Sequence, residues 1–238
     1  AYSDKGQGNY AGKIAVHENK VLPIPGNINL REAGALPTAL LTAYDAMINH
    51  SPLPESGTVL ITACTGAVGV AAMQVARIKG LRVIGTTRSP EKKADIENLG
   101  AQPVVEEDPD KLVEQILSLT GNQGVDYIFD PINGDTATRL LPLIKENGTF
   151  VCYGMLSGNR FSLDASFLFK QVKVHGYVVL NNLADPQALQ KTWNEILPLL
   201  EDNAISIPVA KTFPLQEAAQ AHKEFERHAH FGKLLLVK

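Results

Sequence analysis

Two glycines, Gly66 and Gly69, directly follow a short apolar stretch, and their spacing suits the binding of a phosphate group. Residues 58–63 are rich in β-branched side chains and predict a buried strand. Apolar residues then recur at helical spacing up to Lys79, and Gly80 stands where a helix end requires a positive φ. The unit is a strand, a glycine turn and a helix. Because a helix start carries unpaired N–H groups and a partial positive charge, this turn suits the pyrophosphate of a dinucleotide.

The glycine pattern departs from the usual fingerprint. G-x-G-x-x-G has three glycines, whereas this chain has A-x-x-G-x-x-G with Ala63 at the first position. By itself the pattern also fits a tight turn in any doubly wound protein. A nucleotide triphosphatase loop is excluded because no Lys follows Gly69. A G-x-S-x-G elbow is absent from the sequence, so a hydrolase triad on this sheet has no nucleophile.

The composition is that of an ordinary globular chain. It has 238 residues, 45% hydrophobic and 20% charged, with a formal net charge of -3. We expect no nucleic-acid partner, because no basic cluster is present, and no membrane partner, because no apolar run approaches the roughly 20 residues of a membrane span. The sequence has no signal peptide, which favours a cytoplasmic protein. It begins without Met and in a loop, so we expect either a fragment or an upstream segment that was not counted.

Strands and helices alternate through the middle of the chain. Six strands are predicted, each followed by a turn or helix, at residues 58–63, 81–87, 102–105, 125–130, 148–154 and 172–180. Such an alternation requires a parallel sheet with right-handed crossovers. The fold class is therefore α/β, with a Rossmann doubly wound parallel six-stranded sheet.

The segments before and after this alternation follow another pattern. Residues 9–25 predict two short strands around a turn at His17. Asn29 and Glu32 form a capping-box pattern that starts a helix running to about residue 49, and Pro37 is a candidate break in it. Beyond the alternation, the sequence predicts helix 186–201, strand 205–209, helix 215–226 and strand 233–237. We assign residues 1–40 and 182–238 to a second domain and residues 41–181 to the nucleotide-binding domain.

The end of the second predicted strand bears on the choice between NAD and NADP. In this architecture a carboxylate about 20 residues past the glycines binds the ribose 2′-hydroxyl of NAD. No acid stands at the end of this strand. Instead, Thr87 and Ser89 offer hydroxyls, and Arg88 and Lys92 offer cations that suit a phosphate dianion, although the two cations also fit ordinary surface charges. We therefore predict NADPH as the cofactor.

With these residues in view, the chain resembles the medium-chain dehydrogenase/reductase superfamily, and within it the zinc-free branch of quinone oxidoreductases (ζ-crystallin-like) and enoyl reductases. The resemblance runs collinearly over the whole chain. It rests on GNYAGKIAVHENKVLPIP, ALPTALLTAYDAM and TACTGAVGVAAMQVARIKG, with support from NLGA, GVDYIFDPINGD, GTFVCYGMLSGN, FLFKQVKVHGY and GKLLLVK. It implies an NADPH-dependent reductase of a quinone or an activated carbon–carbon double bond. It also implies that most of a GroES-like catalytic domain is missing, so that residues 1–40 are its remnant and residues 182–238 return to it.

The resemblance also implies site residues. The neighbours of the nicotinamide would be Thr42, Gly154, Met155 and the end of the sixth strand from Val179 to Asn181. The pyrophosphate would contact Gly66, Ala67 and Val68. Thr42 also fits a plain helix hydroxyl. Where relatives place a tyrosine against the adenine, this chain has Glu107, which leaves that contact open.

No catalytic residue is assigned and no metal site is expected. Relatives place the proton donor in the missing segment, and Tyr153, Tyr177 and His175 fit core or strand positions better. The last zinc ligand of zinc-containing relatives would fall near Pro37 or Thr38, neither of which binds zinc. Several further residues fit structural roles instead: Cys64 and Cys152 the core, and His222, His228 and His230 the end of a helix.

Two alternatives to this function are a zinc-free carbonyl reductase and a module or truncated form that binds NADPH without turnover. The sixth strand, residues 172–180, is expected at the sheet edge, where its N–H and C=O groups lack a partner. The resemblance implies a homodimer in which this strand pairs with its copy across a two-fold axis. The alternative is that the chain's own loop at residues 181–185 covers the edge.

Overall fold

The six-stranded parallel sheet predicted from the alternation is confirmed. The computed structural model describes residues 8–106, 108–227 and 229–238. All strands of the sheet run in parallel, in the order β3-β2-β1-β4-β5-β6, with a topological switch point between β1 and β4. The strands are β1 (Thr58–Ile61), β2 (Arg82–Thr87), β3 (Gln102–Val105), β4 (Val125–Asp130), β5 (Ile144–Cys152) and β6 (Lys173–Gly176).

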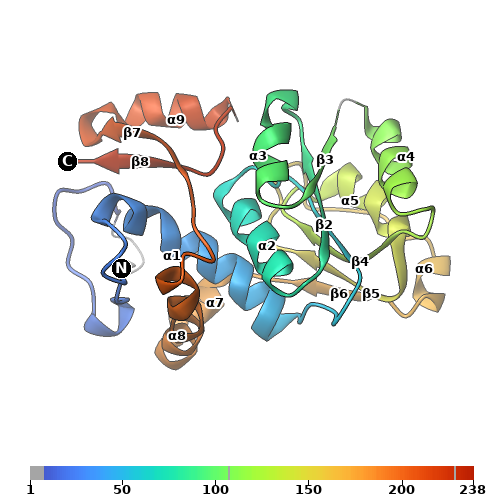
Figure 1. Cartoon of the computed structure of the whole chain (residues 1–238), viewed down its shortest axis with the longest axis horizontal. Coiled ribbons are helices and arrows are strands. Elements are labelled where there is room, and N and C mark those ends of the chain that lie inside the picture. The colour runs from blue at the N-terminus through green and yellow to red at the C-terminus, as the bar shows by residue number, and fades with distance from the viewer. Residues whose placement is uncertain (1–7, 107, 228) are drawn as a thin grey trace.

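Helices cover both faces of this sheet (Figure 1). In β1, Val59 and Ile61 belong to one apolar cluster with α2 (Ala67–Ile78), whereas Leu60 belongs to a second cluster with α4 (Pro109–Leu119). Helix α3 (Lys93–Asn98) adds Ile96 to the first cluster, and α5 (Gly134–Leu140) contributes to the second. Every residue of β1 is buried, as expected for a central parallel strand covered on both sides.

Helix α1 (Leu30–Tyr44) connects the sheet to the rest of the molecule. The predicted capping box is confirmed, because the Asn29 side chain accepts hydrogen bonds from the N–H groups of Arg31 and Glu32 and the Glu32 carboxylate accepts one from Asn29 N–H. The predicted break at Pro37 is wrong. A proline inside a helix costs about 3 kcal/mol, but residues 35–43 bury an apolar face against α2 and α8 (Pro186–Glu201), and this burial offsets the cost.

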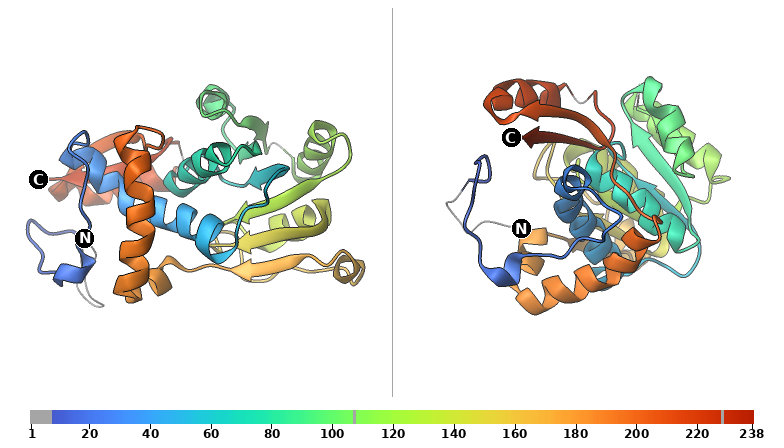
Figure 2. Two further views of the ribbon diagram at one scale, coloured as in Figure 1. Left: turned by 60° about the horizontal axis from the view of Figure 1, so that its bottom comes forward. Right: turned by 60° about the vertical axis from the view of Figure 1, so that its left-hand side comes forward.

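A small unit lies at the other end of α1. Strands β7 (Val209–Pro214) and β8 (Lys233–Val237) pair in parallel and are connected by α9 (Ala218–Glu226). Figures 1 and 2 show this unit and the amino-terminal segment on the side of α1 away from the six-stranded sheet. The division into residues 1–40, 41–181 and 182–238 stays a prediction, and α1 runs across residue 40 as one helix.

The two strands predicted in residues 9–25 are not found. Within that range the structure has only a 3-10 turn at Glu18–Lys20, with extended backbone on either side. Extended backbone becomes a strand only when a neighbouring strand pairs with it, and among the described residues none pairs here. The strand predicted at residues 205–209 begins only at Val209. The preceding backbone bonds instead to the Gln74 amide, which donates to the Ser206 carbonyl at 2.7 Å and accepts from Ser206 N–H at 3.0 Å.

The sixth strand is shorter than predicted. It ends at Gly176, although the Tyr177 N–H still donates to the Cys152 carbonyl of β5 at 2.9 Å, and α7 (Val179–Ala184) then takes the chain away from the sheet edge. The Tyr177 hydroxyl points inward and donates to the Asp45 carboxylate at 2.8 Å. Helix α5 ends at Leu140. A 3-10 turn at Leu141–Leu143 follows α5, and β5 then starts at Ile144.

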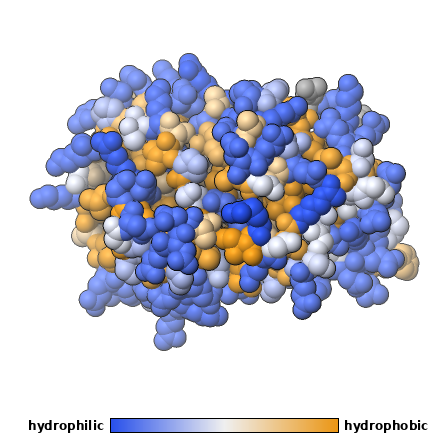
Figure 3. Space-filling model, viewed as in Figure 1, coloured by the Kyte–Doolittle hydropathy of each residue, from blue (hydrophilic) through white to orange (hydrophobic). Residues whose placement is uncertain are grey.

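The surface is mixed in polarity. Figure 3 shows apolar side chains interspersed with polar ones over the middle of one face. The large apolar residues that are most exposed include Leu30, Leu156, Leu168 and Phe169. In the part of the chain that the structure describes, no helix is both long and apolar enough to cross a membrane.

Candidate functional site

The glycine turn joins β1 to α2 at the carboxyl edge of the sheet. Gly66 is the N-cap of α2 and provides no side-chain hydrogen bond to the helix start. The N–H groups in the first turn, which includes the half-buried residues Ala67 and Val68, therefore have no capping side chain. An uncapped start of a 12-residue helix favours an anion, so the structure brings the three predicted pyrophosphate contacts together at one point.

The two glycines of the turn have different roles. A Cβ atom on Gly69 would lie 2.5 Å from Cys64 Cα, so only glycine allows the helix to pack this closely on the turn. A Cβ atom on Gly66 would come no nearer than 3.8 Å to any neighbouring protein atom, the closest being the Ala63 carbonyl oxygen. Ala63 itself has φ of 47°, a conformation that favours glycine. The turn thus has one glycine that permits close packing and one that leaves room for a phosphate.

The carboxyl-terminal part of the chain braces this turn. Gly232 N–H donates to the Thr65 carbonyl at 2.9 Å, and Gly66 and Gly232 form an isolated parallel bridge. Gly232 has φ of 90°, and a Cβ atom there would lie 2.2 Å from the Pro208 carbonyl oxygen. Glycine is therefore required at this position, and the shape of the turn depends on residues far along the chain.

The residues predicted to select NADPH lie at the end of β2. Thr87 is buried, and its hydroxyl accepts a hydrogen bond from Ser89 N–H at 3.2 Å, so it shapes the turn there. Arg88 is exposed. Lys92 is only 4% exposed, and its Nζ lies 3.5 Å from Thr65 Oγ1 at the glycine turn. Burial lowers the pKa of Lys92. The structure therefore places one predicted cation, Lys92, against the glycine turn and the other, Arg88, in solvent.

A carboxylate that was not predicted from the sequence also lies at this edge. Glu106 directly follows β3, and the hydroxyl of Thr86 in β2 donates a hydrogen bond to it. Burial raises the pKa of Glu106, whereas the Thr86 hydroxyl and the Arg88 guanidinium act in the opposite direction. Because parallel neighbours end at the same edge, the residue after β3 could have been found by considering both strands. Glu107, which stands where relatives place a tyrosine against the adenine, lies outside the described residues.

The carboxyl ends of β4 and β5 hold a second set of residues. The Thr62 hydroxyl donates to the Asp130 carboxylate, and burial of this carboxyl raises its pKa. A Cβ atom on Gly154 would lie 2.8 Å from the Pro131 carbonyl oxygen, so glycine allows the two exit loops to pack together. Met155, the next residue, is 67% exposed. Its side chain is therefore accessible at the carboxyl edge of the sheet.

The remaining predicted residues lie in α1 and α7. Thr42 is buried, and its hydroxyl donates to the Thr38 carbonyl at 2.7 Å, as a plain helix hydroxyl does. The prediction of Val179 and Asn181 at a strand end is wrong, because both lie in α7, where Val179 is half-buried and Asn181 exposed. The structure leaves their contact with a nicotinamide, and that of Thr42, as predictions.

A buried polar network surrounds the end of α1, where the chain continues as the π-helical segment η2 (Asp45–His50). The Asp45 carboxylate accepts hydrogen bonds from the Tyr177 hydroxyl at 2.8 Å, the Thr192 hydroxyl at 3.0 Å and the Asn49 amide at 3.1 Å. These bonds connect α1, the segment after β6 and α8. The sequence gives no signal for the bonds from Tyr177 and Thr192, because these donors are far from Asp45 in the chain. With three hydrogen bonds to one buried carboxylate, this network helps to fix the position of its elements.

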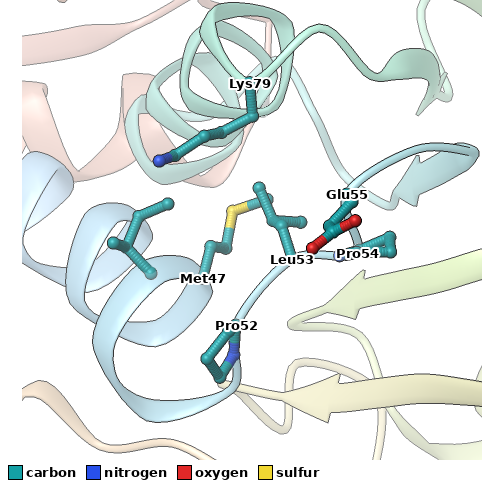
Figure 4. Close-up of a pocket in the computed structure, with 7 residues that line it drawn as sticks. Met47, Pro52, Leu53, Pro54, Glu55 and Lys79 are labelled. Carbon is teal, nitrogen blue, oxygen red and sulfur yellow. The ribbon is translucent and has the colours of Figure 1, made fainter.

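Two hollows lie at opposite edges of the sheet. One, of about 340 Å³, is lined by the start of α5 and by residues 157–160 after β5, at the carboxyl edge. The other, of about 350 Å³, lies between η2, the loop before β1 and the end of α2. Figure 4 shows Lys79 reaching over it from α2, with Glu55 on the loop opposite. Because the second hollow lies at the amino ends of the strands, it is separate from the glycine turn at the carboxyl edge.

The cysteine and histidine residues fit structural roles. Among the residues described, no three His, Cys, Asp or Glu side chains form a group that could hold a metal ion. Cys64 and Cys152 are unpaired thiols, and burial raises the pKa of Cys64 to about 12. His222 shares a hydrogen bond of 3.0 Å with the Tyr10 hydroxyl. His228 lies outside the described residues.

Comparison with known proteins gives a consistent group of relatives. A family model described as zinc-binding dehydrogenase matches residues 67–202, more than half of the chain. The quinone oxidoreductase of Pseudomonas aeruginosa is 28% identical over 241 residues, which cover 100% of this chain and 74% of that protein. A partially reducing polyketide synthase of Talaromyces stipitatus is 29% identical over 94% of this chain. The chain spans only 9% of that synthase.

Solved structures show the same fold. The crystal structure of Escherichia coli quinone oxidoreductase in complex with NADPH superimposes with a TM-score of 0.79 and 27% identity, covering 90% of this chain and 67% of that one. An NAD-dependent alcohol dehydrogenase superimposes with a TM-score of 0.86 and 28% identity, covering 97% of this chain and 66% of that one.

Proposed function

Because the chain belongs to the zinc-binding dehydrogenase family of the medium-chain dehydrogenase/reductase superfamily, we propose that it is an NADPH-dependent oxidoreductase that acts without zinc. Its substrate would be a quinone or an activated carbon–carbon double bond. One observation carries the proposal: the uncapped start of α2 opens on free space at Gly66, with the buried Lys92 directed at the same turn. The chain spans only part of its relatives, so the activity and substrate of the whole protein belong to the proposal.

The residues at the carboxyl edge fit a dinucleotide. The N–H groups of Ala67 and Val68 would hold the pyrophosphate beside Gly66, whose own N–H donates to the Ala63 carbonyl at 3.3 Å, and Arg88 and Lys92 would balance the charge of a 2′-phosphate. The structure of the Escherichia coli relative, which contains NADPH, supports this choice of cofactor. When bound, NADPH supplies the hydride, and the chain orients it.

The nicotinamide would lie over the ends of β4 and β5. Met155 is accessible there, and Gly154 keeps the exit loop close to the sheet. We place Thr42, Val179 and Asn181 on the other side of the nicotinamide, next to the network that Asp45 organises. No described residue is assigned as the proton donor, so the proposal ascribes to this chain binding and orientation of the cofactor.

We also propose that two copies of the chain associate through β6. This strand is at the edge of the sheet, and its Val174 is 44% exposed. Further apolar side chains continue this surface beyond the strand, namely Val178 and Leu180. Pairing of β6 with its copy would bury both edges at once. The observed end of β6 at Gly176 makes this interface shorter than the sequence predicts.

Steady-state assays of NADPH oxidation test the function. With a 1,4-benzoquinone or an enoyl thioester as acceptor, turnover of either supports the proposed activity. Reduction of an aldehyde, without turnover of the quinone or the enoyl thioester, would instead favour the carbonyl reductase. The likeness to an NAD-dependent alcohol dehydrogenase supports this alternative. NADPH binding without any oxidation would indicate a binding module. A chain that binds neither NADPH nor NADH refutes all three.

A further inference from the structure

The carboxylate of Glu106 occupies a fixed position beside β2. Glu106 N–H donates to the Thr87 carbonyl at 2.8 Å, which extends the pairing of β3 with β2 by one residue. The Thr86 hydroxyl, which is fully buried, donates to the carboxylate itself. The side chain is half-buried. It is therefore bonded at both its backbone and its carboxylate, unlike a mobile surface glutamate.

The surroundings of Glu106 are those of the proposed cofactor site. Arg88, which follows β2, interacts electrostatically with both Glu106 and Lys92. Glu106 raises the pKa of Cys64 in the glycine turn and Lys92 lowers it, so both charges lie near this residue. Cys64 N–H donates to the Thr86 carbonyl at 3.0 Å, so the turn and the residue that holds Glu106 are adjacent. The carboxylate and two cations thus share the ends of β1, β2 and β3.

In a Rossmann domain the adenosine ribose binds at the end of β2, where a carboxylate accepts a hydrogen bond from its 2′-hydroxyl. This chain has no acid at that strand end, yet Glu106 reaches it from β3 through Thr86. Resting on the proposed function, we propose that Glu106 determines the cofactor's 2′ specificity. Its carboxylate accepts a hydrogen bond from the 2′-hydroxyl of NADH and opposes the 2′-phosphate of NADPH, so the chain binds both dinucleotides.

This assignment separates the roles of the charged residues. Arg88 and Lys92 attract a 2′-phosphate, and Glu106 repels it. The preference for NADPH over NADH therefore depends on how far the attraction by the two cations exceeds the repulsion by the carboxylate. Removal of the carboxylate should leave the cations unopposed. The chain would then discriminate for NADPH more strongly than the natural sequence does.

The test is a titration of each dinucleotide against the wild-type chain, E106Q and E97Q, followed by nucleotide fluorescence. Glutamine keeps the shape of Glu106 and can still accept the Thr86 hydrogen bond. E97Q is a matched control, because Glu97 is exposed on α3 and carries the same charge. We expect E106Q to shift the ratio of NADPH to NADH affinity toward NADPH by about tenfold or more, and E97Q to change it by less than about twofold.

Urea unfolding shows whether E106Q is folded. If a folded E106Q has the same ratio of NADPH to NADH affinity as the wild-type chain, the inference is overturned and the proposed function still stands. Failure of the wild-type chain to bind either dinucleotide would overturn both. If E106Q does not fold, E106N is scored by the same ratio. An equal shift in E97Q would show a general charge effect and would also overturn the assignment.

Discussion

Substitution of Gly66 by Ala gives a sharp test of the phosphate turn, because the structure separates its effect on binding from its effect on folding. Gly66 has φ of -74° and ψ of 161°, which alanine adopts without strain, and a Cβ atom there has no protein neighbour nearer than 3.8 Å. Alanine reduces the conformational entropy of the unfolded chain, which stabilises the native state, but it is a poorer N-cap than glycine, which destabilises it. These effects oppose each other, so the free energy of unfolding should change by less than about 1 kcal/mol.

Binding should respond differently. The added methyl group points into the space that a pyrophosphate would occupy beside the first turn of α2. We expect G66A to weaken both NADPH and NADH by more than about tenfold, since loss of one charge-assisted hydrogen bond costs about 1.5–3 kcal/mol. The affinities are measured by fluorescence titration and the stability by urea unfolding on the same preparation.

Gly69 provides the matched comparison. A Cβ atom there would lie 2.5 Å from Cys64 Cα, so the backbone must shift, and overpacking of this kind costs about 1–3 kcal/mol. G69A should therefore lose stability, whereas G66A should lose affinity alone. A folded G66A that binds NADPH as tightly as the natural chain would refute the assignment of this turn, and a G69A of unchanged stability would refute the packing argument.

Further predictions concern charge, metal, pH and assembly. Arg88→Glu should weaken NADPH far more than NADH, because repulsion replaces attraction to the 2′-phosphate; equal losses in a titration would contradict the cofactor assignment. Prolonged chelation should leave activity and thermal stability unchanged, and stoichiometric zinc in the purified protein would contradict this. Burial raises the pKa of Glu106 and Asp130 above the unfolded values of about 4. The native state then holds protons that the unfolded state has released, so the free energy of unfolding should fall as the pH rises above about 4; urea unfolding that shows a rise with pH would contradict this. Light scattering should show a dimer at micromolar concentration, and Val174→Asp should give a monomer by placing a charge at the edge of β6; a wild-type monomer would exclude this interface.

A proline at Val178 would not disrupt that edge. Val178 is the N-cap of α7, with φ of -132°, so proline there would distort the start of a helix and would not remove a bond of the sheet. Val174 lies within β6 and is exposed, which makes it the better position.

Local sequence signals predicted the elements whose causes are local. Residues 102–105, 125–130, 186–201 and 233–237 form the predicted strands and helix with the predicted bounds, because alternation and caps specify them. The phosphate turn was predictable for the same reason. Elements set by distant partners were not. Tyr177, just after the short β6, bonds to Asp45, and the late start of β7 depends on Gln74.

The same distinction applies to the site. Gly66 and Lys92 could be placed from the sequence. Gly66 follows the predicted strand that became β1, and Lys92 follows the proline that begins the next helical turn. The depth of Lys92 could not, since it depends on Thr65 in a different turn. Glu106 was overlooked because its relevance arises from the strand beside it, through Thr86. Glu106 would have been included if the residues that follow all of the parallel strands had been considered together.

The bridge between Gly66 and Gly232 has a consequence for biosynthesis. A ribosome releases the phosphate turn long before it releases the strand that braces it, so the nascent chain must hold β1 and α2 without the hydrogen bond from Gly232 to Thr65. A nucleotide that binds only the braced turn would then find no complete site until Gly232 emerges from the ribosome. Products of translation that is interrupted before this residue would remain without cofactor.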